Sequence, residues 1–138
     1  MSVIKKKKVW ITLLIVILIG ILYAITPLFR GPYYLKSVEI ENLRKVGEYK
    51  SEVNNYSIKI YYKSGPILYS EYSYLGSLFK GDNFVRNVFW VGPSGNDFSV
   101  EWKDEKTIKI NNLTSSNPTF TLNILKDKYD FRGIPFFN

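Results

Sequence analysis

The feature that most constrains this chain is an uncharged, apolar run over residues 9–29 of the 138-residue sequence. As a helix, this run would span about 31 Å at about 1.5 Å per residue, close to the ~30 Å hydrocarbon core of a bilayer. Lipid cannot satisfy free backbone groups, so we expect the run to be helical. Trp10 and Tyr23 lie near its ends, where amphipathic rings favour the membrane interface. The sequence therefore predicts one transmembrane helix.

The charges that flank this run predict its orientation. Four lysines precede it: Lys5, Lys6, Lys7 and Lys8. After the run, only Arg30 follows closely. The positive-inside rule then places residues 1–8 in the cytoplasm as a basic tail and the remainder of the chain outside. We expect a single-pass protein of the cell membrane with a linker over residues 30–36 and an extracytoplasmic domain over residues 37–138, and the lipid bilayer is its first expected partner.

A cleaved signal peptide is the alternative interpretation of the same run. The apolar region of a signal peptide is normally about 7–15 residues long and ends in a small-x-small cleavage site. The run here is longer, and its best candidate site, LYAIT, has Leu22 where a small residue is required. A lipoprotein is excluded because the chain has no cysteine to carry the lipid. We therefore favour an uncleaved signal anchor.

The net charge of +7 belongs mostly to the anchor. Residues 31–138 contain 14 Lys or Arg and 12 Asp or Glu, a net charge of +2. A balance this close to neutral does not predict a nucleic-acid partner. The lysines before the helix are explained by topology and by contact with anionic lipid.

The chain has no histidine and no cysteine. This composition excludes a thiolate nucleophile, an imidazole base, a disulfide framework and the usual structural zinc site. A hydrolase that uses a pair of carboxylates would need them across a cleft, and nothing in the sequence locates such a cleft. We predict a protein that is not an enzyme and that has no cofactor and no metal. A carboxylate-based envelope hydrolase remains the alternative.

The rest of the chain has the pattern of β-strands. Residues 56–62 alternate, with Ile58 and Ile60 on one face and Lys59 and Tyr61 on the other. Further strands are expected over residues 67–79, 84–91, 98–102, 107–110 and 119–125, between turns rich in Gly, Pro, Asn and Asp. Residues 37–52 mix two periods and receive no assignment. The pattern predicts a mainly β fold, a small antiparallel meander that forms a sandwich or an open barrel.

The C-terminal half contains a more specific set of residues. They are Phe89, Trp90, Val100, Trp102, Thr107, Ile108, Ile110, Asn111, Leu113, Tyr129, Asp130, Phe131 and Arg132. This set resembles a family of small bacterial membrane-anchored proteins, a domain of unknown function, loosely over residues 50–132 and well over residues 86–132. The sequence departs from the family pattern at Asn112, where the family has glycine, and at residues 114–118, an insertion. The resemblance implies an N-terminal transmembrane helix and an outer domain, and it implies no activity.

Two tryptophans are the first candidates for a binding site. Trp90 and Trp102 each lie at the end of an alternating strand. Aromatic residues at such positions pack in a core, or they form a stacking platform for a sugar or a peptide. The sequence leaves both interpretations open.

The segment YDFR is the second candidate. In an extended strand, Asp130 and Arg132 share one face, and Tyr129 and Phe131 share the other. One interpretation is structural, with rings that cap the core and a charged pair that closes the meander. The other is a binding site in which Arg132 holds a carboxylate or a phosphate.

These observations predict a membrane-anchored β domain that acts by binding at the bacterial cell envelope. Its partner would be cell-wall polymer or another envelope protein. A contiguous exposed aromatic patch would favour such binding. A scaffold subunit of a membrane protein complex is a further alternative, and it would show apolar surface beside the anchor.

Overall fold

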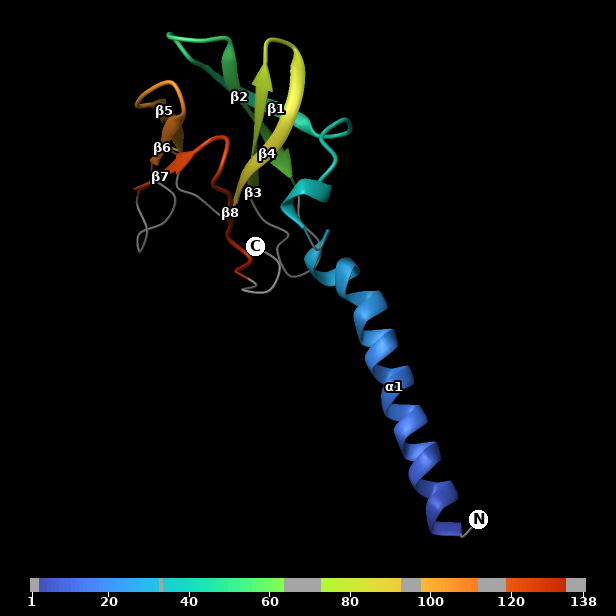
Figure 1. Cartoon of the computed structure of the whole chain (residues 1–138). Coiled ribbons are helices and arrows are strands. Elements are labelled where there is room, and N and C mark those ends of the chain that lie inside the picture. The colour runs from blue at the N-terminus through green and yellow to red at the C-terminus, as the bar shows by residue number, and fades with distance from the viewer. Residues whose placement is uncertain (1–2, 33, 64–72, 93–97, 112–118, 134–138) are drawn as a thin grey trace.

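The structure is a computed structural model that describes residues 3–32, 34–63, 73–92, 98–111 and 119–133. Its first element, α1 (Val3–Arg30), projects as a rod from a β domain (Figure 1). The segment Lys6–Phe29 is long and apolar enough to cross a membrane, and none of it is buried in the protein. A signal sequence near an N-terminus meets the same criteria of length and composition. The predicted helix is confirmed, and it begins before the lysines.

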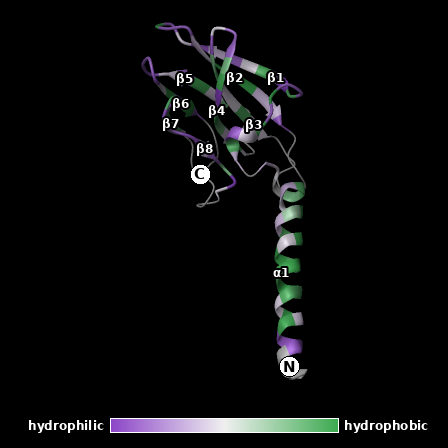
Figure 2. Ribbon diagram, turned by 45° about the vertical axis from the view of Figure 1, so that its right-hand side comes forward, coloured by the Kyte–Doolittle hydropathy of each residue, from purple (hydrophilic) through white to green (hydrophobic). Residues whose placement is uncertain are grey.

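The side chains of α1 are arranged as an anchor requires. Trp10 and Tyr23 are 70% and 63% exposed. The ribbon is hydrophobic along most of its length and hydrophilic near the N-terminus (Figure 2). Two hydroxyls that would face lipid are satisfied within the helix, because Thr12 donates to the Lys8 carbonyl and Thr26 to the Leu22 carbonyl.

The β domain contains two sheets. The first comprises β1 (Arg44–Lys50), β2 (Tyr56–Lys63), β3 (Ser73–Lys80), β4 (Asn83–Val91) and β8 (Tyr129–Asp130), in that order. The second comprises β5 (Ser99–Trp102), β6 (Thr107–Asn111) and β7 (Thr119–Asn123). In Figure 1, β5 to β7 lie beside the larger sheet, and β8 lies near the end of α1.

This arrangement confirms a mainly β sandwich, and the described strands form no closed barrel. The expected antiparallel meander is present twice, in β1 to β4 and in β5 to β7. The expectation fails at β8, which pairs parallel with β4. β1 fills residues that received no assignment. Most of the expected strand over residues 67–79 is β3, but residues 67–72 lie outside the described part, as do Asn112, Leu113 and the insertion at 114–118.

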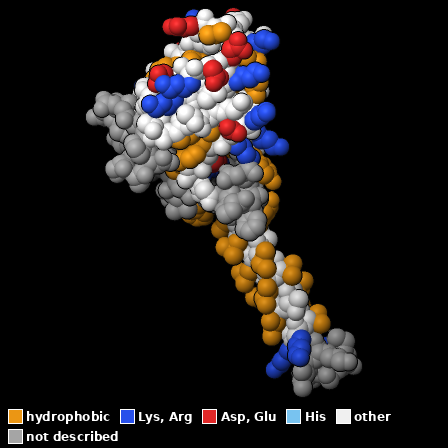
Figure 3. All heavy atoms as spheres, turned by 60° about the vertical axis from the view of Figure 1, so that its left-hand side comes forward, with side chains coloured by type: hydrophobic (Ala, Val, Ile, Leu, Met, Phe, Trp, Pro, Cys, Tyr) orange, Lys and Arg blue, Asp and Glu red, His pale blue; other side chains and the backbone are white. Residues whose placement is uncertain are grey.

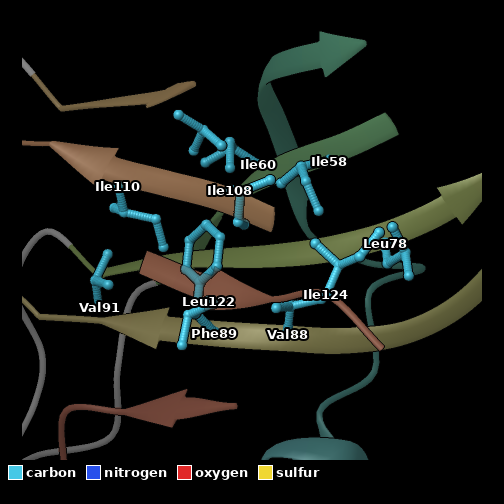
Figure 4. Packing of buried hydrophobic residues seen from close by; sticks show 11 residues of the cluster. Ile58, Ile60, Leu78, Val88, Phe89, Val91, Ile108, Ile110, Leu122 and Ile124 are labelled. Atoms are coloured by element: carbon cyan, nitrogen blue, oxygen red, sulfur yellow. The ribbon is translucent and has the colours of Figure 1, made fainter. Parts of the chain in front are cut away.

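The main core lies between the two sheets. Its fully buried members are Ile58, Leu78, Val88, Phe89, Val91, Ile108, Ile110 and Ile124, with Ile60, Val100 and Leu122 nearly as deep. Figure 4 shows side chains from β2, β3 and β4 meeting those from β6 and β7. Alternation along β2 predicted this face correctly, because Ile58 and Ile60 both point into it.

The outer face of the larger sheet is also covered. Residues 34–43, which we call the strap, include η1 (Leu35–Ser37) and run from the helix across this face. Leu35 and Val38 of the strap are buried against Tyr61, Leu75, Phe79 and Trp90. Tyr61 is therefore only 8% exposed, although alternation alone would leave its face in solvent.

Candidate functional site

The YDFR segment forms a buried charged turn. The Arg132 Nε donates to Asp130 Oδ1 at 2.8 Å, its Nη2 contacts Asp130 Oδ2, and its backbone N–H also donates to Oδ1 at 3.0 Å. The two side chains are 3% and 9% exposed. The Arg132 Nη1 donates to the carbonyl of Pro32, just after α1. The turn thus joins the C-terminal segment to the exit of the helix.

The two rings of this segment lie in different cores, which corrects the expectation of a shared face. Tyr129 packs against the inter-sheet core, with 4.5 Å between the centroids of its ring and the ring of Phe120. Phe131 packs instead on Trp90, in the cluster under the strap, at 5.7 Å between ring centroids. The physical reason is that the strand ends at Asp130, so the following turn breaks the alternation.

Trp90 lies in the core under the strap and is 0% exposed. The guanidinium of Arg132 stacks on its ring at 4.2 Å, and the Lys63 ammonium lies 5.6 Å from it. Burial, followed by the nearby charge of Arg132, lowers the pKa of Lys63. These contacts favour the packing interpretation of Trp90, since no face of its ring is open to a ligand.

Trp102 has a different environment. It is partly buried at the edge of the inter-sheet core, and its Nε1 donates to the Tyr49 carbonyl oxygen at 3.0 Å. This bond joins β5 to β1, the edge strands of the two sheets. Beside it lies a groove of about 600 Å³, lined by residues 48–53 and 100–104, which we call the β1–β5 groove. Trp102 thus borders a cavity, as a binding residue would.

The β1–β5 groove is polar and charged. Its lining holds the carboxylates of Glu48, Glu52, Glu101 and Asp104. It also holds the ammonium groups of Lys50 and Lys103, so four negative and two positive charges give a net charge of −2. Figure 3 shows Lys and Arg interspersed with Asp and Glu over the β domain, while α1 shows hydrophobic side chains.

Three of these carboxylates have a lowered pKa. A hydrogen bond from Lys45 to Glu48, 3.0 Å long, is the main cause at Glu48, and burial opposes it. A hydrogen bond from Lys103, at 2.7 Å, lowers the pKa of Glu101. The backbone N–H groups of Lys106 and Thr107, each at 2.8 Å, help to lower the pKa of Asp104. All three side chains therefore stay ionised at neutral pH.

A second hollow of about 290 Å³ continues from the groove. The two cavities share Glu48, Lys50 and Ser51. The second is lined further by residues 54–57 and by the turn at Gly81 and Asp82. That turn joins β3 to β4 at the end of the domain far from α1 (Figure 1). The two cavities therefore adjoin, and together, as what we call the trough, they reach the end of the domain away from the helix.

The structure separates the predicted site residues into two places. Trp90, Asp130 and Arg132 lie together beside the helix exit, with Tyr129 next to them in the inter-sheet core, while Trp102 lies in the groove. Sequence reasoning missed the β1 side of the groove, because residues 37–52 received no assignment. The polar residues of GEYKSE, residues 47–52, were the available signal for this side of the groove. They do not show which other strand lies opposite them.

No metal site emerges from the described residues. They contain no group of three or more Asp or Glu side chains placed to hold a metal ion. Glu48 and Glu101 of the groove are instead paired with lysines, and Asp104 is bonded to backbone N–H groups.

Residues 5–133 match a Family of unknown function (DUF5412). The chain belongs to this family. The match covers the helix, both sheets and the turn at Asp130 and Arg132, and it agrees with the resemblance seen in the C-terminal half. No curated protein and no solved structure matches the chain. Membership in DUF5412 assigns the chain to a family but to no function. The groove is the structural feature from which a function can be proposed.

Proposed function

We propose that this DUF5412 protein is a single-pass protein of the bacterial cell membrane whose extracytoplasmic β domain binds an envelope ligand in the β1–β5 groove. The ligand is cell-wall polymer or a segment of another envelope protein. The observation that carries the proposal is the groove itself, an open cavity of about 600 Å³ beside a fixed tryptophan. Ligand sites are commonly clefts of about 300–1,000 Å³ with a few placed polar groups.

The anchor supports the location. The helix carries exposed lysines at residues 6–8 and no acidic residue in its first turn. Under the positive-inside rule these charges favour a cytoplasmic N-terminus. The bond from Arg132 to Pro32 holds the β domain within a few residues of the helix end. The domain would therefore lie close to the outer surface of the bilayer, with its trough extending away from it.

Binding fits the site better than catalysis does. Carboxylate-based hydrolysis needs one carboxyl group with a raised pKa to act as the general acid. Glu48, Glu101 and Asp104 all have a lowered pKa. Their charges are engaged by lysines or backbone N–H groups, which suits a binding surface.

The scaffold alternative has less support. The exposed large apolar side chains of the described β domain come from separate segments: Tyr34, Val46, Val53, Phe84, Val85 and Leu125. Scattered single residues of this kind are normal on a soluble surface. The contiguous exposed aromatic patch that would have favoured binding is also missing from the described surface, so the binding proposal rests on the groove.

Two exposed valines provide a matched test. Val53 lines the groove and is 66% exposed, whereas Val85 on β4 is 44% exposed and does not line it. The full-length protein in detergent micelles is pelleted with bacterial cell walls, before and after the walls are treated with protease. We expect Val53→Arg to reduce pelleting and Val85→Arg to leave it unchanged, with both variants melting like the native protein. Equal pelleting by both variants would show that the groove is not the binding site.

A further inference from the structure

We infer that the β1–β5 groove binds a hexopyranose chain that is uncharged or carries amino groups. This inference rests on the proposed function and specifies its ligand. Three features of the groove carry it: a fixed aromatic ring, a polar rim and a negative charge.

The ring of Trp102 is held in place before any ligand arrives. Its Nε1 donates to the Tyr49 carbonyl at 3.0 Å, and the side chain packs against the inter-sheet core. Trp102 is only partly buried and lines the groove, so it presents there a side chain that is held in one orientation. The C–H face of a pyranose ring is apolar and weakly positive, so it packs favourably on the negative face of an indole. A fixed ring also loses little conformational entropy on binding.

The groups around Trp102 match the hydroxyls of a sugar. Glu52 and Asp104 accept hydrogen bonds, Lys50 and Lys103 donate them, and Ser51 does both. Hydrogen bonds in which one partner is charged are stronger than neutral ones. Val53 and Val100 are the aliphatic residues of the lining, so an apolar ligand would find little complementary surface.

The charge of the groove selects against polyanions. Its lining has a net charge of −2, although the whole chain has a net charge of +7. Lys45, Lys59, Lys106 and Lys109 also act on the groove carboxylates from nearby, but they are not part of the lining. Like charges in one site cost binding energy, whereas an amino group on the ligand would be attracted. The expected ligand is therefore neutral or cationic.

The strand beside the groove disfavours an added peptide strand. An edge strand offers unpaired backbone groups, but bulges and exposed lysines are features that prevent a new strand from pairing. β1 has an irregular register between Lys45 and Gly47. Lys45 and Lys50 are both exposed on it. A peptide partner thus fits the groove less well than a glycan does.

The second hollow predicts a preference for chains over single sugars. It shares Glu48, Lys50 and Ser51 with the groove and adds Asn54, Asn55 and Asp82. Amide and carboxylate side chains are again suited to hydroxyls. A chain of several rings would contact both cavities, and a monosaccharide would contact one.

Defined oligosaccharides test the inference by calorimetry on the full-length protein in detergent micelles. The probes are a hexamer of β-1,4-linked N-acetylglucosamine, the same hexamer without acetyl groups, and a heparin-derived hexasaccharide as the anionic chain. We expect both glucosamine chains to bind, with the deacetylated one tighter, and the heparin chain not to bind. Val53→Arg should raise the Kd of the glucosamine chains at least about tenfold, equivalent to 1.4 kcal/mol. Val85→Arg should leave the Kd unchanged.

The possible outcomes separate this inference from the proposed function. Binding of the heparin chain alone, or of no sugar at all, would overturn the inference. If the sugars fail to bind but Val53→Arg still reduces pelleting with cell walls, the groove remains a binding site for a different ligand. Loss of that pelleting after protease treatment of the walls would identify a protein partner and would also overturn the inference. Sugar binding that is equally strong in Val53→Arg would place the sugar elsewhere and contradict it.

Discussion

Arg132 shows how one residue joins three parts of this molecule. It pairs with Asp130 in its own turn, stacks on Trp90 in the core under the strap, and donates to Pro32 after the helix. On the sequence alone, an exposed ion pair would contribute little, and the rings of YDFR would matter more. The burial of both charged side chains changes this expectation.

We predict that Arg132→Ala destabilises the domain by about 3–5 kcal/mol, because it leaves the buried carboxylate of Asp130 unpaired. Thermal unfolding of the full-length protein in detergent measures the effect. Lys45→Ala is the control, since it breaks the exposed pair with Glu48 and should cost about 1 kcal/mol or less. Similar melting temperatures for the two variants would contradict a structural role for Arg132.

Gly76 and Phe89 are a second pair, in which the ring of Phe89 leaves no room for a side chain at position 76. They are directly opposed on β3 and β4. The ring of Phe89 is fully buried and occupies the space where a Cβ at position 76 would lie. A glycine in the middle of a strand marks this kind of close approach.

We predict that Gly76→Ala costs about 3 kcal/mol or more, because a buried ring cannot move aside without strain in the core. Gly47→Ala on β1 is the matched control. Its Cβ would meet Tyr49 and Ile60 at 3.7 and 3.8 Å, which is ordinary contact, so the expected change is within about 1 kcal/mol. Chemical denaturation compares the two, and a Gly76→Ala protein as stable as Gly47→Ala would contradict this packing argument.

At the scale of elements, the strap explains why the larger sheet is buried on both faces. Its backbone is fixed by one side chain, because Asn87 Nδ2 donates to the carbonyls of Leu35 and Val38 at 3.0 and 2.8 Å. The Oδ1 of the same residue accepts a hydrogen bond from Ser77 Oγ at 2.7 Å. Asn87 is 3% exposed, so water does not replace these bonds.

We predict that Asn87→Leu releases the strap. The change removes the partner of the Val38 carbonyl and of the Ser77 hydroxyl, and each buried group left unpaired costs about 1–3 kcal/mol. The Leu35 carbonyl keeps its bond from the Val38 N–H. Hydrogen exchange of residues 35–43 should become faster, while exchange in β6 should remain slow. Asn83→Leu, at the exposed start of β4, is the control and should leave the strap protected. Unchanged exchange in Asn87→Leu would mean that apolar packing alone holds the strap.

The strands that the sequence predicted well are those with one clear apolar face. β2, β4, β5, β6 and β7 were found within a few residues, because alternation and turn residues mark them. β1 was missed because most of its side chains are exposed and its register is irregular between Lys45 and Gly47, which removes the period. β8 has two residues and a parallel partner about 40 positions earlier, and no local pattern reveals such a pairing.

The candidate site was predictable only in part for the same reasons. Trp90 and Trp102 looked alike in the sequence, since each ends an alternating strand. Trp90 is buried because the strap covers it, and Trp102 borders a groove because the edges of the two sheets meet beside it. Both features depend on residues 34–53, for which the sequence pattern predicted no strand or helix.

At the scale of the whole molecule, α1 and the β domain are joined at two points. α1 leads through Gly31 and Pro32 into the strap, and the C-terminal turn returns to Pro32. We predict that the mature protein keeps its N-terminus and remains with membranes through an alkaline carbonate wash, because the helix is long enough to span the bilayer. Mass spectrometry of the purified protein checks this. A soluble product that begins near Ile25 would show instead that the helix is a cleaved signal.

The last prediction concerns the side of the membrane on which the β domain lies. The lysines at residues 5–8 precede the span, and the positive-inside rule retains such charges in the cytoplasm. Protease added to intact protoplasts should therefore digest the β domain while a cytoplasmic marker protein stays whole. Replacing all four lysines with glutamine leaves Arg30 as the nearest flanking charge, so part of the population should invert and become protected. Protection of the native domain in intact protoplasts, with digestion only after detergent is added, would place it in the cytoplasm, and a groove that binds wall glycans would then have no access to its ligand.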